Sequence, residues 1–194
     1  TNETKWSIDQ ANSEITFKVG HIIISNIKGS FKTFGATVFT NGTNFNTAEI
    51  DLWIDANSIS TGDKNRDIQL KGKDFLDVEK HPQITFNITH MKQQDKDGNH
   101  ELWGELTIKG ISKRVTLYTK AWEILDAQKR NEKAKFIISG KFNRSDWDLY
   151  GKSYFEAGGM MVSKDVKILC NIQLINMGPR NQIMELETDL SKAT

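Results

Sequence analysis

Apolar and polar residues alternate with a period of two along most of this chain. In a β-strand successive side chains point to opposite faces, so this alternation predicts strands with one dry and one wet face. The pattern occurs in seven separate segments, namely 15–19, 48–56, 84–88, 102–108, 115–121, 136–142 and 166–174. An eighth segment, between Gly29 and Phe39, carries apolar residues on both parities. The sequence therefore predicts an all-β fold with eight antiparallel strands.

One segment, residues 58–86, interrupts the β pattern with a short helix and a loop. We expect this helix at about 62–72, because Thr61 or Asp63 can cap its start and Gly72 can end it. Its expected apolar side and the apolar loop after it consist of Ile68, Leu70, Phe75, Leu76 and Val78. A single helix between long strands predicts a barrel with one end partly covered, so the fold suggests a container.

Composition excludes several classes of partner. The 194 residues suit one domain with a sizeable core. Lys plus Arg number 26 and Asp plus Glu 25, so no basic excess favours nucleic acid or an anionic membrane surface. No apolar run approaches the roughly 18 residues that a membrane span needs, so we expect no stable membrane insertion. The single cysteine, Cys170, rules out an internal disulfide.

Alternation alone does not decide whether the barrel is filled or hollow. An eight-stranded barrel either packs side chains inside or holds one ligand. Small residues at inward positions favour space inside; they are Ala48, Ala56, Gly104, Ala121 and Gly140. A packed barrel would also carry Phe, Ile and Leu at such positions, so both interpretations stay open at this point.

Short motifs follow one another in a fixed order from Trp6 to about Ile175. They are Trp6-x-Ile8-Asp9, Ser13-x-Ile15-x-Phe17-x-Val19-x-His21, Gly29-x-Phe31, Ser58-Ile59-x-Thr61, Arg66-Asp67, Leu70, Asp74-Phe75, Pro82-x-Ile84-x-Phe86, Gly104-x-Leu106-Thr107-Ile108-x-Gly110-Ile111-x-Lys113-x-Val115-Thr116-Leu117 and Asn143-Arg144-Ser145-Asp146-Trp147. The series resembles the YceI-like family of bacterial lipid-binding proteins. The resemblance implies a lipocalin-like barrel over 1–176, with a tail at 177–194. That family usually has a glycine two residues past the Arg144-Ser-Asp-aromatic site, whereas here Asp148 follows Trp147.

The resemblance also implies that the lumen binds a long-chain isoprenoid lipid or quinone. Carriage or sequestration of this ligand needs neither chemistry nor a cofactor, so we expect no enzyme and no catalytic residue. The candidate lumen residues are Phe17, Val19, His21, Ile54, Leu70, Phe75, Phe86, Leu106, Ile108, Leu117, Phe136, Ile138, Phe142, Ile168 and Ile172. Arg66 and Arg144 are polar candidates at the mouth, because guanidinium groups suit phosphate or quinone oxygens. Alternatively, Arg66-Asp67 pairs with neighbours and holds the helix to the wall.

Two other classes of function stay open. An enzyme acting on a lipid or quinone would need an acid–base group in the lumen, and His21 continues the inward parity of its strand. A lone strand histidine is also a common structural residue. The histidines lack zinc spacing and no cysteine cluster exists, so we expect no metal site. A carbohydrate-binding module would use Trp53, Trp103 and Trp122, and it predicts a row of exposed, coplanar indoles.

The remaining expectations concern a loop, the tail and the location. The stretch 143–162 is rich in glycine and aromatic residues, and a loop of this length is often functional. In the tail, Ile183, Leu186 and Leu190 have helical spacing, so a short helix could pack on the barrel, mediate a homodimer or fray. The chain starts at Thr1 with no signal-like apolar segment, which fits a processed periplasmic or secreted protein but also a trimmed chain.

Overall fold

A computed structural model of the protein describes residues 3–21, 26–93, 96–120, 122–125, 132–149 and 162–192, without the side chains of His21 and Gln93. Its strands are β1 (Glu3–Ile8), β2 (Glu14–His21), β3 (Asn26–Phe31), β4 (Phe34–Asn41), β5 (Asn44–Asp55), β6 (Ile59–Ser60), β7 (Gln83–Gln93), β8 (His100–Ile108), β9 (Ile111–Thr119), β10 (Glu123–Leu125), β11 (Lys133–Asn143) and β12 (Val162–Pro179). Its helices are α1 (Lys64–Lys71) and α2 (Arg180–Lys192), with 3-10 turns η1 (Gln10–Asn12), η2 (Ala56–Ser58) and η3 (Arg144–Trp147).

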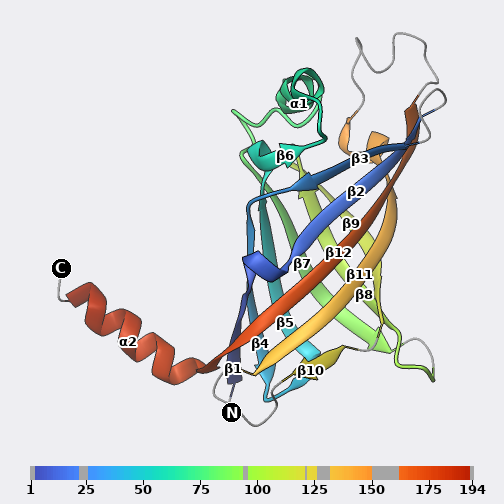
Figure 1. The fold of residues 1–194 in the computed structure, drawn as a ribbon. Coiled ribbons are helices and arrows are strands. Elements are labelled where there is room, and N and C mark those ends of the chain that lie inside the picture. The colour runs from blue at the N-terminus through green and yellow to red at the C-terminus, as the bar shows by residue number, and fades with distance from the viewer. Residues whose placement is uncertain are drawn as a thin grey trace.

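The strands form one antiparallel sheet in the order β10-β11-β9-β8-β7-β5-β4-β1-β12-β2-β3-β6. A further pairing of β11 with β12 closes this sheet into a barrel (Figure 1). Four places in the wall are each shared by two successive strands: β1 and β2, β3 and β4, β5 and β6, and β9 and β10. The other four places belong to β7, β8, β11 and β12, which confirms the predicted eight-stranded antiparallel barrel.

A break in the second wall strand explains its mixed parity in the sequence. β3 ends at Phe31, β4 starts at Phe34, and residues 32–33 between them belong to neither strand. The two intervening residues shift the inward parity, so Ile27 and Phe31 face inward before the break, and Phe34 and Val38 are buried after it. Both sets of apolar residues therefore face the interior.

Helix α1 and its loop lie over one end of the barrel (Figure 1). The predicted helix is confirmed: Asp63 caps it by accepting hydrogen bonds from the backbone N–H groups of Asn65 and Arg66, and Gly72 follows its last residue. Of the two residues predicted for its apolar side, Leu70 faces the barrel, but the prediction for Ile68 was wrong because this residue is 67 % exposed. Residues two apart lie about 200° apart around a helix, so both cannot face the same side.

The opposite end is filled by four aromatic side chains, Trp6, Phe45, Trp122 and Phe136, which we call the aromatic floor. Trp6 and Phe45 have no exposed surface, and their ring centroids are 5.0 Å apart. The Trp6 indole N–H donates to Thr40 Oγ1 at 2.7 Å, so the polar atom of this buried ring is satisfied. The floor closes the end of the barrel that lies away from α1.

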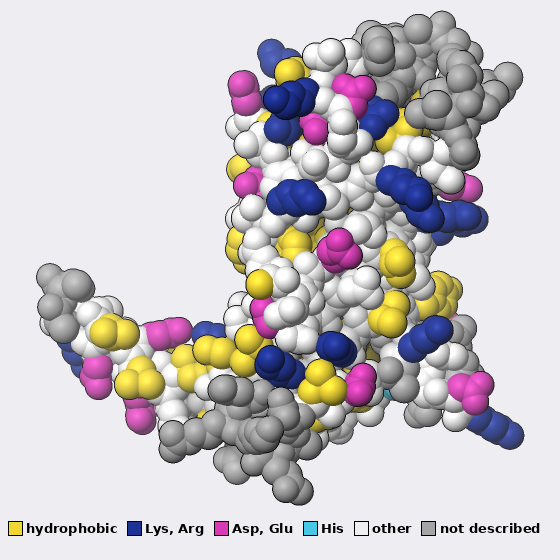
Figure 2. Space-filling view, viewed as in Figure 1, with side chains coloured by type: hydrophobic (Ala, Val, Ile, Leu, Met, Phe, Trp, Pro, Cys, Tyr) yellow, Lys and Arg dark blue, Asp and Glu magenta, His cyan; other side chains and the backbone are white. Residues whose placement is uncertain are grey.

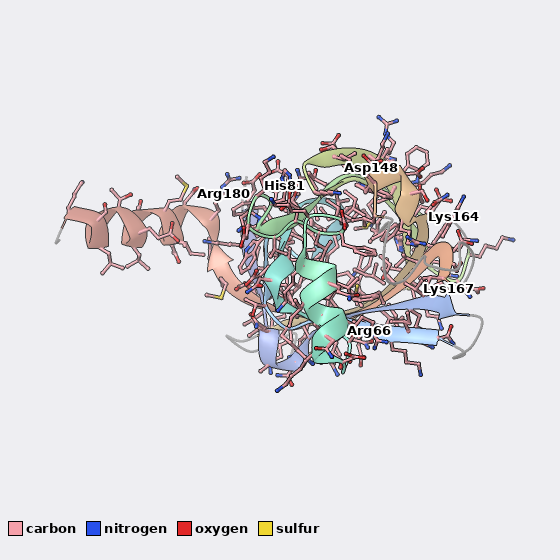
Figure 3. All side chains as sticks on the ribbon, turned by 90° about the horizontal axis from the view of Figure 1, so that it is seen from above. Arg66, His81, Asp148, Lys164, Lys167 and Arg180 are labelled. Carbon is pink, nitrogen blue, oxygen red and sulfur yellow. The ribbon has the colours of Figure 1, made fainter. Side chains whose placement is uncertain are left out.

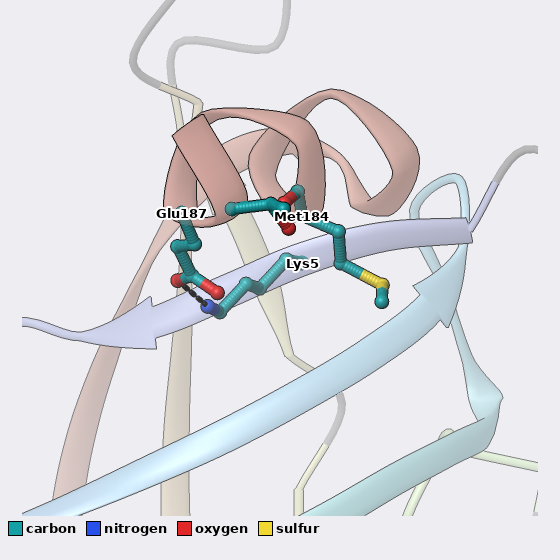
Figure 4. Close-up of polar contacts among 4 residues, drawn as sticks. Lys5, Met184 and Glu187 are labelled. Atoms are coloured by element: carbon teal, nitrogen blue, oxygen red, sulfur yellow. Dashed lines mark hydrogen bonds and ion pairs between the residues drawn. The ribbon is translucent and has the colours of Figure 1, made fainter. Parts of the chain in front are cut away.

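The tail forms the helix α2, which projects from the barrel next to β1 (Figure 1). The boundary expected at residue 176 lies inside β12, which continues to Pro179 before the helix begins. Lys5 pairs with Glu187 at 3.3 Å (Figure 4), and Arg180 pairs with Glu3 at 2.8 Å.

The apolar side chains of α2 remain largely uncovered. Leu186 and Leu190 are 63 % and 71 % exposed, and apolar side chains follow the helix in the space-filling view (Figure 2). Within the described residues, neither helix has the length and apolar character that crossing a bilayer requires.

Candidate ligand-binding site

An apolar cavity of about 250 Å³ lies inside the barrel, and all eight places in the wall contribute side chains to it. β12 alone lines it with Val162, Val166, Ile168, Cys170, Ile172 and Leu174. At about 3.3 Å per residue, this run extends roughly 40 Å along the strand. The barrel is therefore hollow along much of its length, which decides between the two interpretations that alternation had left open.

The structure places fourteen of the fifteen predicted lumen residues on this cavity. They are Phe17, Val19, Ile54, Leu70, Phe75, Phe86, Leu106, Ile108, Leu117, Phe136, Ile138, Phe142, Ile168 and Ile172. The fifteenth, His21, ends β2, but its side chain lies outside the described residues. Alternation identified the twelve that lie on strands, because each inward residue in a barrel faces the lumen, whereas Leu70 and Phe75 came from the predicted helix and its apolar loop.

Inward glycines do not create the space in the way that the sequence suggested. A Cβ on Gly104 would lie 2.8 Å from the ring of Phe86, and a Cβ on Gly140 would overlap Leu117. Phe86 and Leu117 therefore lie across these glycines and occupy the room that they leave.

Met91 is a cavity residue that alternation missed. A register shift between Ile88 and His90 marks a β-bulge in the pairing of β7 with β8. A bulge inserts one extra residue and reverses the parity after it. Met91 consequently lines the cavity and His90 is exposed, although continued alternation from Ile88 predicts the reverse.

Arg66, at the end covered by α1 (Figure 3), both lines the cavity and fixes the helix. Its Nε donates to Thr61 Oγ1 and its Nη2 to the Thr61 carbonyl, each at 2.8 Å. The carboxylate of Asp67 accepts from the Thr61 backbone N–H at 2.9 Å and from its hydroxyl at 2.6 Å. The pair therefore holds α1 through hydrogen bonds to Thr61, while Arg66 stays in contact with the lumen.

Arg144 also lines the cavity, and its side chain is buried. Its Nε donates to the carbonyl of Ser163 at 2.9 Å, and its Nη2 donates to that of Val162 at 3.4 Å. Its Nη1 donates to the carbonyl of Leu149. Arg144 thus ties the segment after β11 to the start of β12, through backbone acceptors that the sequence alone does not identify.

The turn after Arg144 accounts for the departure from the family pattern. Asp148 has φ 54° and ψ 31°, the left-handed conformation in which glycine has no steric cost and Asp is tolerated. Trp147 before it is buried, and its indole N–H donates to the Leu106 carbonyl at 3.1 Å. The glycine- and aromatic-rich part of the loop, residues 150–161, lies outside the described residues.

The chemistry of the described lining is almost entirely apolar. Its side chains with polar or thiol groups are Thr16, Arg66, Arg144 and Cys170. Burial raises the pKa of the Cys170 thiol to about 12, so this thiol is a poor nucleophile near neutral pH. The arrangement can remove an apolar molecule from water and offer it guanidinium groups at one end.

The row of indoles expected for a carbohydrate module is not formed. Trp53 and Trp103 are 39 % and 37 % exposed on the outer face, as predicted. Trp122 instead belongs to the aromatic floor, where its ring lies 4.7 Å from that of His100 and 5.7 Å from that of Phe45. The prediction for Trp122 was wrong because this residue precedes the short strand β10, outside the regular alternation of β9.

The chain matches a known protein family and known relatives. The YceI-like domain matches residues 6–174. A UPF0312 protein of Staphylococcus aureus is 30 % identical over 165 residues, which cover 84 % of this chain and 93 % of the relative.

Two solved structures share the fold. BcnA of Burkholderia cenocepacia superposes with a TM-score of 0.72 at 23 % identity, covering 86 % of this chain and 98 % of BcnA. A polyisoprenoid-binding domain from Saccharophagus degradans gives a TM-score of 0.66 at 14 % identity, covering 88 % of this chain and 98 % of that domain. Because the YceI-like domain matches most of its length, this chain belongs to the YceI-like domain family.

Proposed function

We propose that this protein binds a long-chain isoprenoid lipid or quinone in the barrel lumen, and that it carries or sequesters this ligand without altering it. The observation that carries the proposal is the apolar cavity that follows the length of the barrel. The polyisoprenoid-binding domain of Saccharophagus degradans, which has the same fold, supports it.

The shape of the cavity favours a slender chain. Its volume of about 250 Å³ lies below the roughly 300–1,000 Å³ of pockets for compact drug-sized ligands. This small volume extends along a roughly 40 Å run of β12, so the cavity is narrow for its length. Burial of a chain there would contribute about 0.8 kcal/mol per methylene group. Ordering the flexible chain offsets part of this gain.

Arg66 is the group best placed to meet a polar head. Its Nε and Nη2 bind Thr61, and the guanidinium carries further N–H donors. A phosphate or quinone oxygen at this end would accept a charge-assisted hydrogen bond while the chain occupies the lumen. Arg144, whose donors reach three backbone carbonyls, would contribute positive charge more than new hydrogen bonds.

The second candidate is an enzyme that acts on the same kind of ligand, and His21 is the residue that distinguishes the two. For a carrier, His21→Ala should change lipid affinity by less than about tenfold, because a hydrogen bond contributes roughly 0.5–1.5 kcal/mol. For an enzyme, the same substitution should abolish turnover of a quinone or prenyl substrate. Turnover that disappears in His21→Ala would replace our proposal with the enzyme.

A matched pair of substitutions on β11 tests binding in the lumen. Ile138 lines the cavity, whereas its neighbour Ile137 is 49 % exposed on the outer face. Native mass spectrometry of the purified protein, followed by organic extraction, should reveal a stoichiometric long-chain molecule. Ile138→Trp should reduce the bound fraction at least about tenfold because it fills the narrow lumen, whereas Ile137→Trp should leave it unchanged. Equal binding by both variants would contradict the lumen as the site.

The proposal includes a periplasmic or secreted location, where a water-insoluble chain needs a carrier to cross an aqueous space. Fractionation of the source cells tests this part separately. Recovery of the protein in the cytoplasmic fraction would contradict the location without affecting the binding site.

A further inference from the structure

Neighbouring strands of the barrel wall stop pairing along one part of β5 and β7. Their register runs from Asp55↔Gln83 to Ile50↔Ile88 and ends there. Both strands continue beyond this pair, β5 back to Asn44 and β7 on to Gln93. The β-bulge after Ile88 increases the twist of β7 at the point where it leaves β5. A groove of about 520 Å³ lies between the separated strands, which we call the side slot.

The pairing of β9 with β11 is also short, but there another element covers the gap between the strands. β9 and β11 share only the pairs Ile138↔Thr119 and Ser139↔Tyr118. There η3 lies against β9 and β12, with its Trp147 only 1 % exposed and 5.0 Å from the ring of Phe142. The described residues that line the side slot, in contrast, all belong to β5 and β7.

The side slot and the lumen meet at shared side chains. Ile50, Ile88 and Met91 line both, so these three residues form the partition between the groove and the cavity. Two of them belong to the last paired rung, whereas Met91 follows the bulge. A methionine has three flexible torsions and adapts its shape at low cost, so Met91 is suited to move aside.

The slot has a defined lower boundary near the aromatic floor. His100 on β8 is 5 % exposed, and its Nε2 lies 3.1 Å from Oδ1 of Asn46 on β5. This contact spans the gap between the strands below the groove. Its Nδ1 is buried without a hydrogen-bond partner. The slot therefore lies between the Ile50↔Ile88 rung and the His100–Asn46 contact, on the part of the wall nearest the closed end of the barrel.

We infer that the side slot is a lateral portal through which the far end of the lumen ligand leaves the barrel. This inference rests on the proposed function. A chain with its polar end at Arg66 points its other end toward the aromatic floor, where Trp6 and Phe45 leave no exit. A chain longer than the lumen must then turn aside, and the side slot is the opening beside it. Short chains fit inside, whereas longer ones extend past Met91 to the surface.

The test uses fatty alcohols of increasing length that carry a nitroxide on the terminal carbon, bound to the full chain and observed by NMR. With long probes, paramagnetic broadening should be strongest at amides 46–50 and 88–91, and weak at α1. With short probes the broadening should stay inside the barrel, at inward residues of β11 and β12. Broadening by long probes at α1 or at the hairpins of the closed end, without the slot, would overturn the portal.

Ala48→Phe, on the β5 side of the slot, provides a second measurement, with Thr37→Phe on the outer face of β4 as the matched control. Ala48→Phe should weaken binding of long probes at least about tenfold, equivalent to about 1.4 kcal/mol, and leave short probes within about twofold. Equal effects on both lengths would contradict the portal while preserving lumen binding. If the unmodified protein binds none of the probes, the proposed function itself is contradicted, and so is the portal that rests on it.

Discussion

At the scale of single residues, Cys170 provides a test of how well the lumen excludes water. Burial raises the pKa of its thiol to about 12 from a reference value of 9.0. At pH 8 this lowers the thiolate fraction about a thousandfold, and the thiolate is the reactive species. Alkylation by iodoacetamide should therefore be at least about 10³-fold slower in the native protein than in the unfolded chain, as followed by mass spectrometry. Comparable rates would mean that the lumen is open to water at Cys170.

The same shift predicts a dependence of stability on pH. Because the folded pKa is higher than the unfolded one, the unfolded chain loses its proton first as the pH rises above about 9. The contribution of Cys170 to the free energy of unfolding should then fall by up to about 1.4 kcal/mol per pH unit between pH 9 and 12. The difference in the free energy of unfolding between the wild type and Cys170→Ala, measured by urea unfolding at each pH, should show this slope. Parallel pH profiles would contradict a buried thiol.

At the scale of elements, Thr61 joins α1 to the barrel. Its hydroxyl accepts from Arg66 and donates to Asp67, so Thr61→Val removes two side-chain bonds and keeps the shape. Hydrogen exchange at the amides of α1 should accelerate at least about tenfold, consistent with a loss of roughly 1–2 kcal/mol. Exchange in β11 and β12 should be unchanged. Accelerated exchange throughout the barrel would show that α1 is an integral part of the core.

Phe75, in the loop after α1, belongs to the same element. Its side chain is half-buried and lines the cavity, as expected for a candidate lumen residue. Phe75→Ala should therefore cost less than the roughly 3–5 kcal/mol typical of a fully buried ring. It should also reduce the stabilisation that an added lipid provides. Thermal melts with and without lipid separate the two effects, and a large loss without lipid would favour a purely structural role.

The elements also show what the sequence can predict and what it cannot. Strands, the single helix and its Asp63 cap follow from local patterns, and so did the inward residues of regular strands such as Phe136 and Ile138. The break at residues 32–33, the bulge that turns Met91 inward and the packing of Trp122 depend on neighbouring strands. Alternation along one strand carries no information about these partners. The roles of Arg144 and Thr61 likewise became visible only with their hydrogen-bond acceptors in place.

At the scale of the whole molecule, ligand binding should stabilise the barrel. A ligand that binds only the folded state, present at a hundredfold excess over its Kd, adds about 2.7 kcal/mol to the free energy of unfolding. For a chain of this size the expected rise in Tm is roughly 5–10 °C. Differential scanning calorimetry with a prenol should detect it, and a short-chain alcohol is the control. An equal rise with both alcohols would mean that chain burial is not the source of stabilisation.

The position of β12 also determines how the chain must fold. This strand pairs with β11 along one edge and with β1 and β2 along the other, joining Lys5 to Gly178 and Ile15 to Cys170. Contacts between residues so distant in the chain have a high cost in loop-closure entropy, and such topologies fold in milliseconds to seconds. A ribosome-bound chain cannot close the barrel before its last strand emerges. Until then two unpaired strand edges and an apolar interior are exposed, so the time between synthesis and closure is when this protein is most vulnerable to aggregation.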